Sequence, residues 1–128
     1  MLVTISTLIS KIKAAYVAKA YFLDVGYSDI SRKFVLKLIE EGFVSTCEVF
    51  EYDSQKVLRI GLLPNSGFVG VVMGSTPGFR VFLSLYRLRK LKQRVPSATV
   101  LLSTKYGFLT SSEALRRNVG GLLICVIY

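Results

Sequence analysis

The chain has 128 residues, of which 52% are hydrophobic, and a formal net charge of +9 from 17 Lys and Arg against 8 Asp and Glu. That length suits one ordinary domain or two small subdomains, and the apolar content excludes a disordered basic tail. A folded chain this basic indicates a polyanionic partner, either a nucleic acid or an acidic membrane surface.

The chain contains no His and only two cysteines, Cys47 and Cys125. It therefore has no imidazole base and no His metal ligand, and it cannot form a four-Cys zinc site or a disulfide framework. Both cysteines lie in apolar runs, which favours two buried thiols over a single disulfide. We expect no metal, no cofactor and no small-molecule substrate.

The mean hydropathy of +0.49 raises the alternative of a membrane protein. Residues 60–79 carry no charge and could span a bilayer by length alone. The run contains two prolines and five glycines, however, which a lipid-exposed helix does not tolerate, so we expect strand, turn and strand and no membrane partner. The first eleven residues lack the features of a presequence, so we expect either that the protein works where it is made or that its presequence is missing.

The first half of the chain is predicted to form two helices and a hairpin. Apolar residues at helical spacing predict an amphipathic helix over 4–19, followed by an extended piece at 21–25. Ser28 can cap a second helix, and Gly42 stands where a left-handed C-terminal cap belongs. The period then changes to two. Strands are expected over 43–52 and 56–63, around a turn at 53–55.

The second half is predicted to alternate short strands with two short helices. Ser84 can cap a helix with Leu85, Leu88 and Leu91 on its apolar face, and a shorter helix is expected over 111–117. Turns or loops are expected at 64–67, 76–78 and 104–107, and strands at 68–73, 79–83, 99–103 and 122–127.

This order of elements predicts an α+β fold in two pieces. The N-terminal subdomain, residues 1–66, would consist of two helices and a β-hairpin. It would pack on a C-terminal subdomain, residues 67–128, with a mixed β-sheet and two short helices.

The excess of positive over negative charge lies in the second half of the chain. Residues 1–53 hold six basic and seven acidic side chains, whereas residues 54–128 hold eleven basic and one acidic. The densest run, 87–94, has no acidic residue to pair with its cations, which favours phosphate contact. A solvated helix face and a membrane-surface helix are the alternatives.

Motifs for catalysis are absent. Glu40 and Glu41 are adjacent and point in different directions on a helix, and residues 74–78 lack the Gly-Lys-Ser/Thr ending of a phosphate-binding loop. Ser103 and Thr104 have no His to activate them. We therefore expect no enzyme.

Four motifs follow one another in order along the chain. They are Leu-Ile-Ser-Lys-Ile-Lys at 8–13, Glu-Glu-Gly-Phe at 40–43, Pro-Gly-Phe-Arg-Val-Phe at 77–82, and Ser-Thr-Lys-Tyr-Gly at 103–107 with Gly-Gly at 120–121. Together they resemble one family, the universal small-subunit ribosomal protein number eight in its bacterial and organellar form. The resemblance covers essentially the whole chain. It departs from the family at Ala14, at Asp29, in the loop at Lys105 and Tyr106, and at Leu122.

The resemblance implies a structural constituent of the small ribosomal subunit. Such a protein would bind small-subunit rRNA in the central domain through its C-terminal subdomain, contact neighbouring small-subunit proteins, and support subunit assembly and translation. The alternative is a free-standing RNA-binding regulatory protein that uses the same basic surface.

The resemblance, together with the chemistry of the side chains that this chain has at the matching positions, indicates the site residues. Ser103 and Thr104 would bind a 2′-hydroxyl or a base edge, Lys105 a phosphate, and Tyr106 an unpaired base, while Gly107 allows a close backbone approach. The alternatives are a strand-end turn for the Ser-Thr pair and core packing for Tyr106. The further rRNA contacts implied are Pro77, Gly78 and Arg80, then Lys11 and Lys13, and, as positioning contacts, Arg87, Arg89, Lys90, Arg116 and Arg117.

The composition suggests a compartment. The chain is rich in Phe, Tyr, Leu and Val and has no His or Trp. We expect a mitochondrial ribosome, with a plastid or the bacterial cytoplasm as alternatives.

Overall fold

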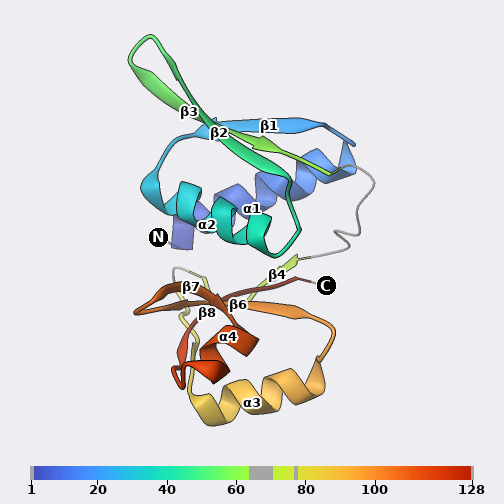
Figure 1. Ribbon diagram of the computed structural model, residues 1–128, viewed down its shortest axis with the longest axis vertical. Helices are drawn as coiled ribbons and strands as arrows, with labels where there is room; N and C mark the ends of the chain where they lie inside the picture. The colour runs from blue at the N-terminus through green and yellow to red at the C-terminus, as the bar shows by residue number, and fades with distance from the viewer. Residues whose placement is uncertain (1, 64–70, 77, 128) are drawn as a thin grey trace. The chain divides into compact units, whose positions relative to one another are not determined.

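The computed structural model describes residues 2–63, 71–76 and 78–127 (Figure 1). Apart from Leu2, the chain divides into two compact units between Phe68 and Val69, called here the N-terminal and the C-terminal unit. The subdomain boundary expected after residue 66 falls outside the described residues and stays a prediction.

The N-terminal unit is a three-stranded antiparallel sheet with two helices on one face. Figure 1 shows both helices on the same side of this sheet and the end of the β2–β3 hairpin projecting past them. The strand order is β1-β3-β2. The elements are α1 (Leu2–Val17), β1 (Phe22–Gly26), α2 (Asp29–Glu40), β2 (Thr46–Tyr52) and β3 (Gln55–Gly61).

Apolar side chains from the helices and the central strand are buried in this unit. Phe34 is fully buried and Leu38 nearly so on α2, as the helical spacing predicted, and Ile12 is buried on α1. Leu58 and Ile60 of β3 are fully buried, which fixes the face of the sheet that the helices cover, because strand side chains alternate between faces.

Local chemistry sets the ends of the helices. The Ser28 side chain caps α2 by accepting a hydrogen bond from the Ser31 amide at 3.1 Å, as predicted. Gly42 follows the helix with a φ of +83°, also as predicted. α1 begins and ends two residues earlier than expected. It ends early because the chain leaves the helical conformation by Lys19, whose φ is +57°.

The β2–β3 hairpin turns through Asp53 and Ser54. Both residues have positive φ, +47° and +68°, which is the pattern of a two-residue turn whose twist matches that of the strands. The turn pairs Tyr52 with Gln55, and this register runs along the whole hairpin.

The C-terminal unit is a five-stranded sheet with two helices on one face, as Figure 1 shows. The strand order is β4-β8-β6-β7, and β5 also pairs with β8. The elements are β4 (Val71–Met73), β5 (Phe82–Leu83), α3 (Leu85–Arg94), β6 (Thr99–Thr104), β7 (Gly107–Thr110), α4 (Ser111–Arg116) and β8 (Gly121–Ile127).

Every pairing described in this sheet is antiparallel, whereas the sequence led us to expect a mixed sheet. For β6 and β7 the physical reason is the two-residue connection between them, because parallel neighbours need a long crossover. Strand β7 was not expected at all. The segment 104–107, predicted as a loop, is instead the turn of a β6–β7 hairpin.

The core of this unit lies between the sheet and its helices. It is made of Leu88, Val100, Leu102, Leu109 and Ala114. The predicted cap Ser84 begins α3, and its side chain accepts a hydrogen bond from the Arg87 amide.

Other boundaries differ from the prediction by a few residues. The expected strands at 68–73 and 79–83 shorten, within the described residues, to β4 and β5. No helix in the described part of the chain is both long enough and apolar enough to cross a membrane.

Candidate nucleic-acid interface

The tip of the β6–β7 hairpin is held by one side chain. The Thr104 hydroxyl donates a hydrogen bond to the Gly107 carbonyl oxygen at 3.0 Å and accepts one from the Tyr106 amide at 3.1 Å. Gly107 has a φ of +97°, a conformation that favours glycine. Thr104 therefore has the turn-forming role that was the alternative to RNA contact, and its hydroxyl can still accept one further hydrogen bond.

Two cations meet the aromatic ring at this tip. Tyr106 is 51% exposed, which is inconsistent with core packing. The Lys105 Nζ lies 5.1 Å from the ring centroid, and the Arg117 Cζ, from the end of α4, lies 4.8 Å from it. The fold thus brings two elements together in a cluster of Lys105, Tyr106 and Arg117, called here the hairpin-tip cluster.

Arg116 is exposed and precedes Arg117 in the sequence, but among the described residues the cations found over the Tyr106 ring are those of Lys105 and Arg117. Ser103 lies one residue before Thr104 and is half-buried. The candidate site therefore combines two hydroxyl side chains, one aromatic ring, and two cations that lie against that ring.

A second turn presents Gly78 and Arg80 to solvent. Thr76 and Phe79 exchange two backbone hydrogen bonds, at 2.9 and 3.0 Å, across this turn. Ser75 is 1% exposed, and its hydroxyl accepts a hydrogen bond from the Val81 amide at 3.0 Å, which ties the turn to β5. The expected contact at Pro77 lies outside the described residues.

The sequence analysis missed several residues of this region. Phe79 and Phe82 flank Arg80 along the chain and are 72% and 65% exposed. The alternation of residues 79–83 could have pointed to Phe82, because it lies two positions from Arg80 and so on the same side of an extended strand. The role of Ser75 leaves no signal in the sequence.

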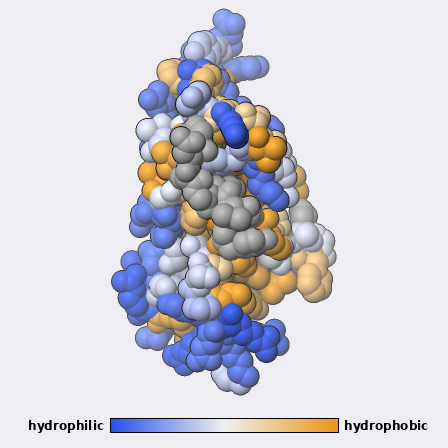
Figure 2. All heavy atoms as spheres, turned by 90° about the vertical axis from the view of Figure 1, so that its right-hand side faces the viewer, coloured by the Kyte–Doolittle hydropathy of each residue, from blue (hydrophilic) through white to orange (hydrophobic). Residues whose placement is uncertain are grey.

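Helix α3 turns one apolar side inward and its cations outward. Leu88 is fully buried, while Arg87, Arg89 and Lys90 are exposed. In the part of the chain that the structure describes, no acidic side chain pairs with these three. The lower end of Figure 2, where α3 lies, is covered by hydrophilic side chains. Lys92 has another role, because it donates a hydrogen bond to the Ser112 hydroxyl and links α3 to α4.

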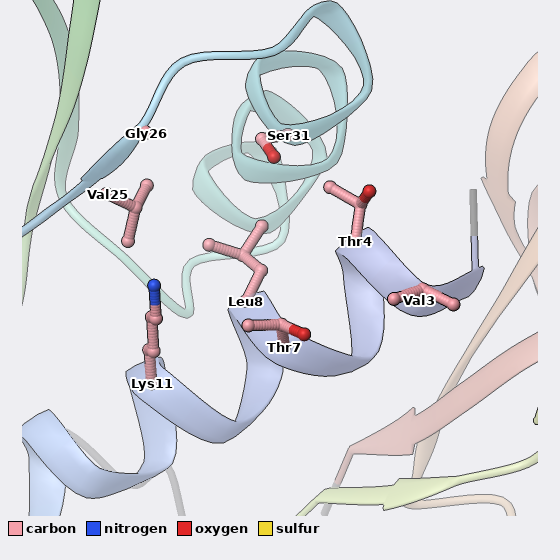
Figure 3. A pocket seen from close by; sticks show the side chains of 8 residues that line it. All are labelled: Val3, Thr4, Thr7, Leu8, Lys11, Val25, Gly26 and Ser31. Atoms are coloured by element: carbon pink, nitrogen blue, oxygen red, sulfur yellow. The ribbon is translucent and has the colours of Figure 1, made fainter.

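Lys11 lines a groove in the N-terminal unit. The groove has a volume of about 310 Å³. Figure 3 shows the Lys11 amine extending toward Val25, with the side chains of Thr4 and Thr7 along the same helix. Lys13 is exposed but is not among the lining residues, because two positions on a helix differ by about 200°. The structure does not bring the two lysines together.

The Gly120-Gly121 pair lets strands approach closely. A Cβ on Gly120 would lie 2.3 Å from the Leu83 carbonyl oxygen, and one on Gly121 would lie 2.7 Å from that of Ser103. The absence of side chains on the two glycines thus allows the start of β8 to lie close to the backbone of β5 and β6.

The cysteines are free and have no part in the interface. Burial raises the pKa of the Cys125 thiol to about 12, and desolvation also raises that of the half-buried Cys47. Among the described residues, no three Cys, Asp or Glu side chains gather closely enough to hold a metal ion.

Comparison with known proteins extends over nearly the whole chain. The family model described as Ribosomal protein S8 matches residues 4–128. The chain belongs to the ribosomal protein S8 family. It is similar to the small ribosomal subunit protein uS8 of Clostridioides difficile (strain 630), with 30% identity over 97% of this chain and 96% of that protein. The uS8 proteins of Streptococcus pneumoniae serotype 19F (strain G54) and Streptococcus sanguinis (strain SK36) are 34% and 33% identical over the same shares.

As an S8-family member, the chain is a small-ribosomal-subunit protein with a structural role, not an enzyme. Its place in translation follows from this membership.

Proposed function

We propose that the chain binds small-subunit rRNA directly, in the central domain, through its C-terminal unit, and so supports subunit assembly and translation. The observation that carries this proposal is the hairpin-tip cluster. An exposed aromatic ring and two cations from different elements meet there, next to the hydroxyls of Ser103 and Thr104.

This arrangement suits the chemistry of an RNA helix and its loops. The shallow minor groove of RNA displays 2′-hydroxyls and base edges, which small hydroxyl side chains can bind. Thr104 would act as an acceptor, because its proton is already donated within the turn. Lys105 and Arg117 would bind phosphates, and Tyr106 would stack on a base while the cations hold its ring.

The other basic residues would position the RNA without reading it. Arg80, with Pro77 and Gly78, would form the second contact. Lys11 and Lys13 would touch separate phosphates, with the hydroxyls lining the Lys11 groove as further donors. The positioning contacts on the helices would be Arg87, Arg89, Lys90 and Arg116.

The experiment compares binding to a small-subunit rRNA fragment with binding to an unrelated RNA. We expect the double variant Ser103→Ala and Tyr106→Ala to weaken binding to the fragment at least about tenfold, because a hydrogen bond and a stacked base are lost. Binding to the unrelated RNA should change much less.

The matched control is Tyr52→Ala, since Tyr52 is 56% exposed, close to the 51% of Tyr106, but belongs to the N-terminal unit. It should leave both affinities unchanged. An equal loss on both RNAs for the double variant would refute the assignment of the hairpin.

We also infer that the ribosome in question is mitochondrial. The support is the composition, rich in Phe, Tyr, Leu and Val without His or Trp; the relatives named above are bacterial. Cell fractionation tests this proposal, which fails if the chain is found on ribosomes outside mitochondria.

A further inference from the structure

Both helices of the N-terminal unit lie on one face of its sheet, and in the described part of the chain no helix covers the other face. Leu58 and Ile60 are fully buried and therefore lie on the face that the helices cover, so Val57 and Arg59 lie on the opposite side of β3. The strand register then places residues of β1 and β2 beside them. This outer face is formed by Phe22, Asp24, Glu48, Phe50, Tyr52, Val57 and Arg59.

Arg59, the cation at the centre of this face, is already neutralised. Its guanidinium donates two hydrogen bonds to the Asp24 carboxylate, from Nε at 2.8 Å and from an NH2 group at 2.9 Å. The same group lies 4.5 Å from the Phe22 ring centroid and 4.9 Å from that of Phe50. The hydrogen bonds from Arg59 hold the pKa of Asp24 below its usual value, so the pair stays ionised at neutral pH.

The remaining groups of the outer face are acidic and aromatic. Glu48 lies opposite Arg59 in the register and has no ion-pair partner in the described part of the chain. Phe22 and Tyr52 are 53% and 56% exposed, and Tyr52 stacks on Phe50 with ring centroids 6.2 Å apart. The face therefore carries a net negative charge on a chain whose total is +9.

The negative charge and the exposed rings of the outer face disfavour binding of RNA and favour binding of a basic protein. Phosphates would be repelled by Glu48, whereas the ammonium and guanidinium groups of Lys and Arg are attracted both to a carboxylate and to exposed aromatic faces. Aromatic side chains are also the residue type that most often anchors a protein interface.

We propose that the outer face is a docking surface for a basic segment of a neighbouring small-subunit protein. The cations of that segment would contact Glu48 and the rings of Phe22 and Tyr52. The proposal rests on membership in the small subunit. It names the kind of protein that the chain would contact there and the surface that it would use. It does not depend on the rRNA contacts of the hairpin-tip cluster.

Hydroxyl-radical footprinting tests the proposal on three samples. These are the free chain, the chain bound to protein-free small-subunit rRNA, and whole small subunits that contain the chain. We expect oxidation of Phe22 and Tyr52 in the first two samples and a strong loss of it in the third. Protection by rRNA alone, or oxidation in all three samples, would overturn the proposal.

Tyr106 serves as an internal control for the separate rRNA proposal. If the hairpin-tip cluster binds rRNA, Tyr106 becomes protected in the second sample. Its continued oxidation there would count against the rRNA site and would leave the result for the outer face unaffected.

A charge reversal on the outer face distinguishes a basic protein partner from RNA, because retention of the chain in small subunits should change in opposite directions for the two. Glu48→Lys should lower the amount of the chain retained in salt-washed small subunits about threefold or more, because like charges then face each other. An unchanged or increased retention would contradict a basic partner, and an increase would indicate RNA instead.

The matched control is Glu51→Lys on the same strand. Glu51 is also exposed, but it lies an odd number of residues from Glu48 and so on the other side of β2. Its reversal should leave retention unchanged. Thermal unfolding of both variants shows whether the fold is intact.

Discussion

At the scale of single residues, small residues of the C-terminal unit fix the shape of its turns and the spacing of its strands. Thr104 closes the hairpin turn, and buried Ser75 fixes the turn before β5. Gly120 and Gly121 keep β8 close to the backbone of its neighbours. The residues that hold the candidate interface in shape are therefore largely distinct from the exposed side chains that would touch RNA.

Replacement of Gly120 by Ala should destabilise the protein. The added Cβ would stand 2.3 Å from a backbone oxygen, so β8 or the Leu83 strand has to move, at a cost of about 1–3 kcal/mol. Urea unfolding measures this loss. Gly26→Ala is the control, because no atom lies within 4 Å of a Cβ at that position. Equal stability of the two variants would show that the approach is not tight.

Capping residues could be predicted from the sequence, whereas long-range partners could not. Ser28, Ser84 and Gly42 act on backbone groups a few residues away, so their types and positions suffice. The contacts of Arg59 with Asp24 depend on a strand pairing between residues 35 positions apart. The contact of Arg117 with Tyr106 likewise exists only once α4 has packed beside the hairpin.

At the scale of elements, α3 and the β6–β7 hairpin divide the proposed binding between charge and specificity. The helix exposes Arg87, Arg89, Lys90 and Arg94, none of which has an acidic partner among the described residues, and the hairpin presents hydroxyls and a ring. Phosphate contacts contribute affinity that falls steeply with salt, since bound counterions are released.

Neutralising α3 should reduce this salt dependence. We expect the triple variant Arg87→Gln, Arg89→Gln and Lys90→Gln to weaken binding to any RNA and to lower the slope of log affinity against log salt by about 2–3. Filter binding at several salt concentrations measures the slope. The control set, made of Arg32→Gln, Lys33→Gln and Lys56→Gln, removes the same charge from the N-terminal unit, and a matching change in slope there would refute the assignment to α3.

The type of most elements could be predicted, but their ends and one strand could not. The helices could be predicted from the helical spacing of apolar residues and from the capping residues. The β2–β3 hairpin could be predicted because its apolar residues alternate with a period of two. Strand β7 was missed because it contributes only Phe108 and Leu109 as an apolar pair before the cap of α4, too short a run to show a period. The antiparallel order of the second sheet is likewise decided by pairing rather than by local pattern.

At the scale of the whole molecule, the unequal distribution of charge along the chain is the feature with the widest effect. Residues 54–128 hold eleven basic side chains against one acidic, and residues 1–53 hold nearly equal numbers. The surface proposed to bind rRNA and the face proposed to dock a basic protein therefore differ in the sign of their charge.

The tagged chain should sediment with the small subunit at moderate salt. Gradient centrifugation of cell extracts followed by detection of the tag measures this distribution. Sedimentation in the light fractions alone would favour the free-standing RNA-binding regulator over the ribosomal constituent.

The position of β8 has a consequence for how the protein is made. This strand is the last of its sheet in chain order, yet it pairs with β4, β5 and β6. The strands of the N-terminal unit all precede residue 62 and can pair while synthesis continues, because domains form as units from the N-terminal end. The C-terminal sheet must wait for its central member, so the surface proposed to bind rRNA becomes complete only after residues 121–127 have been synthesised.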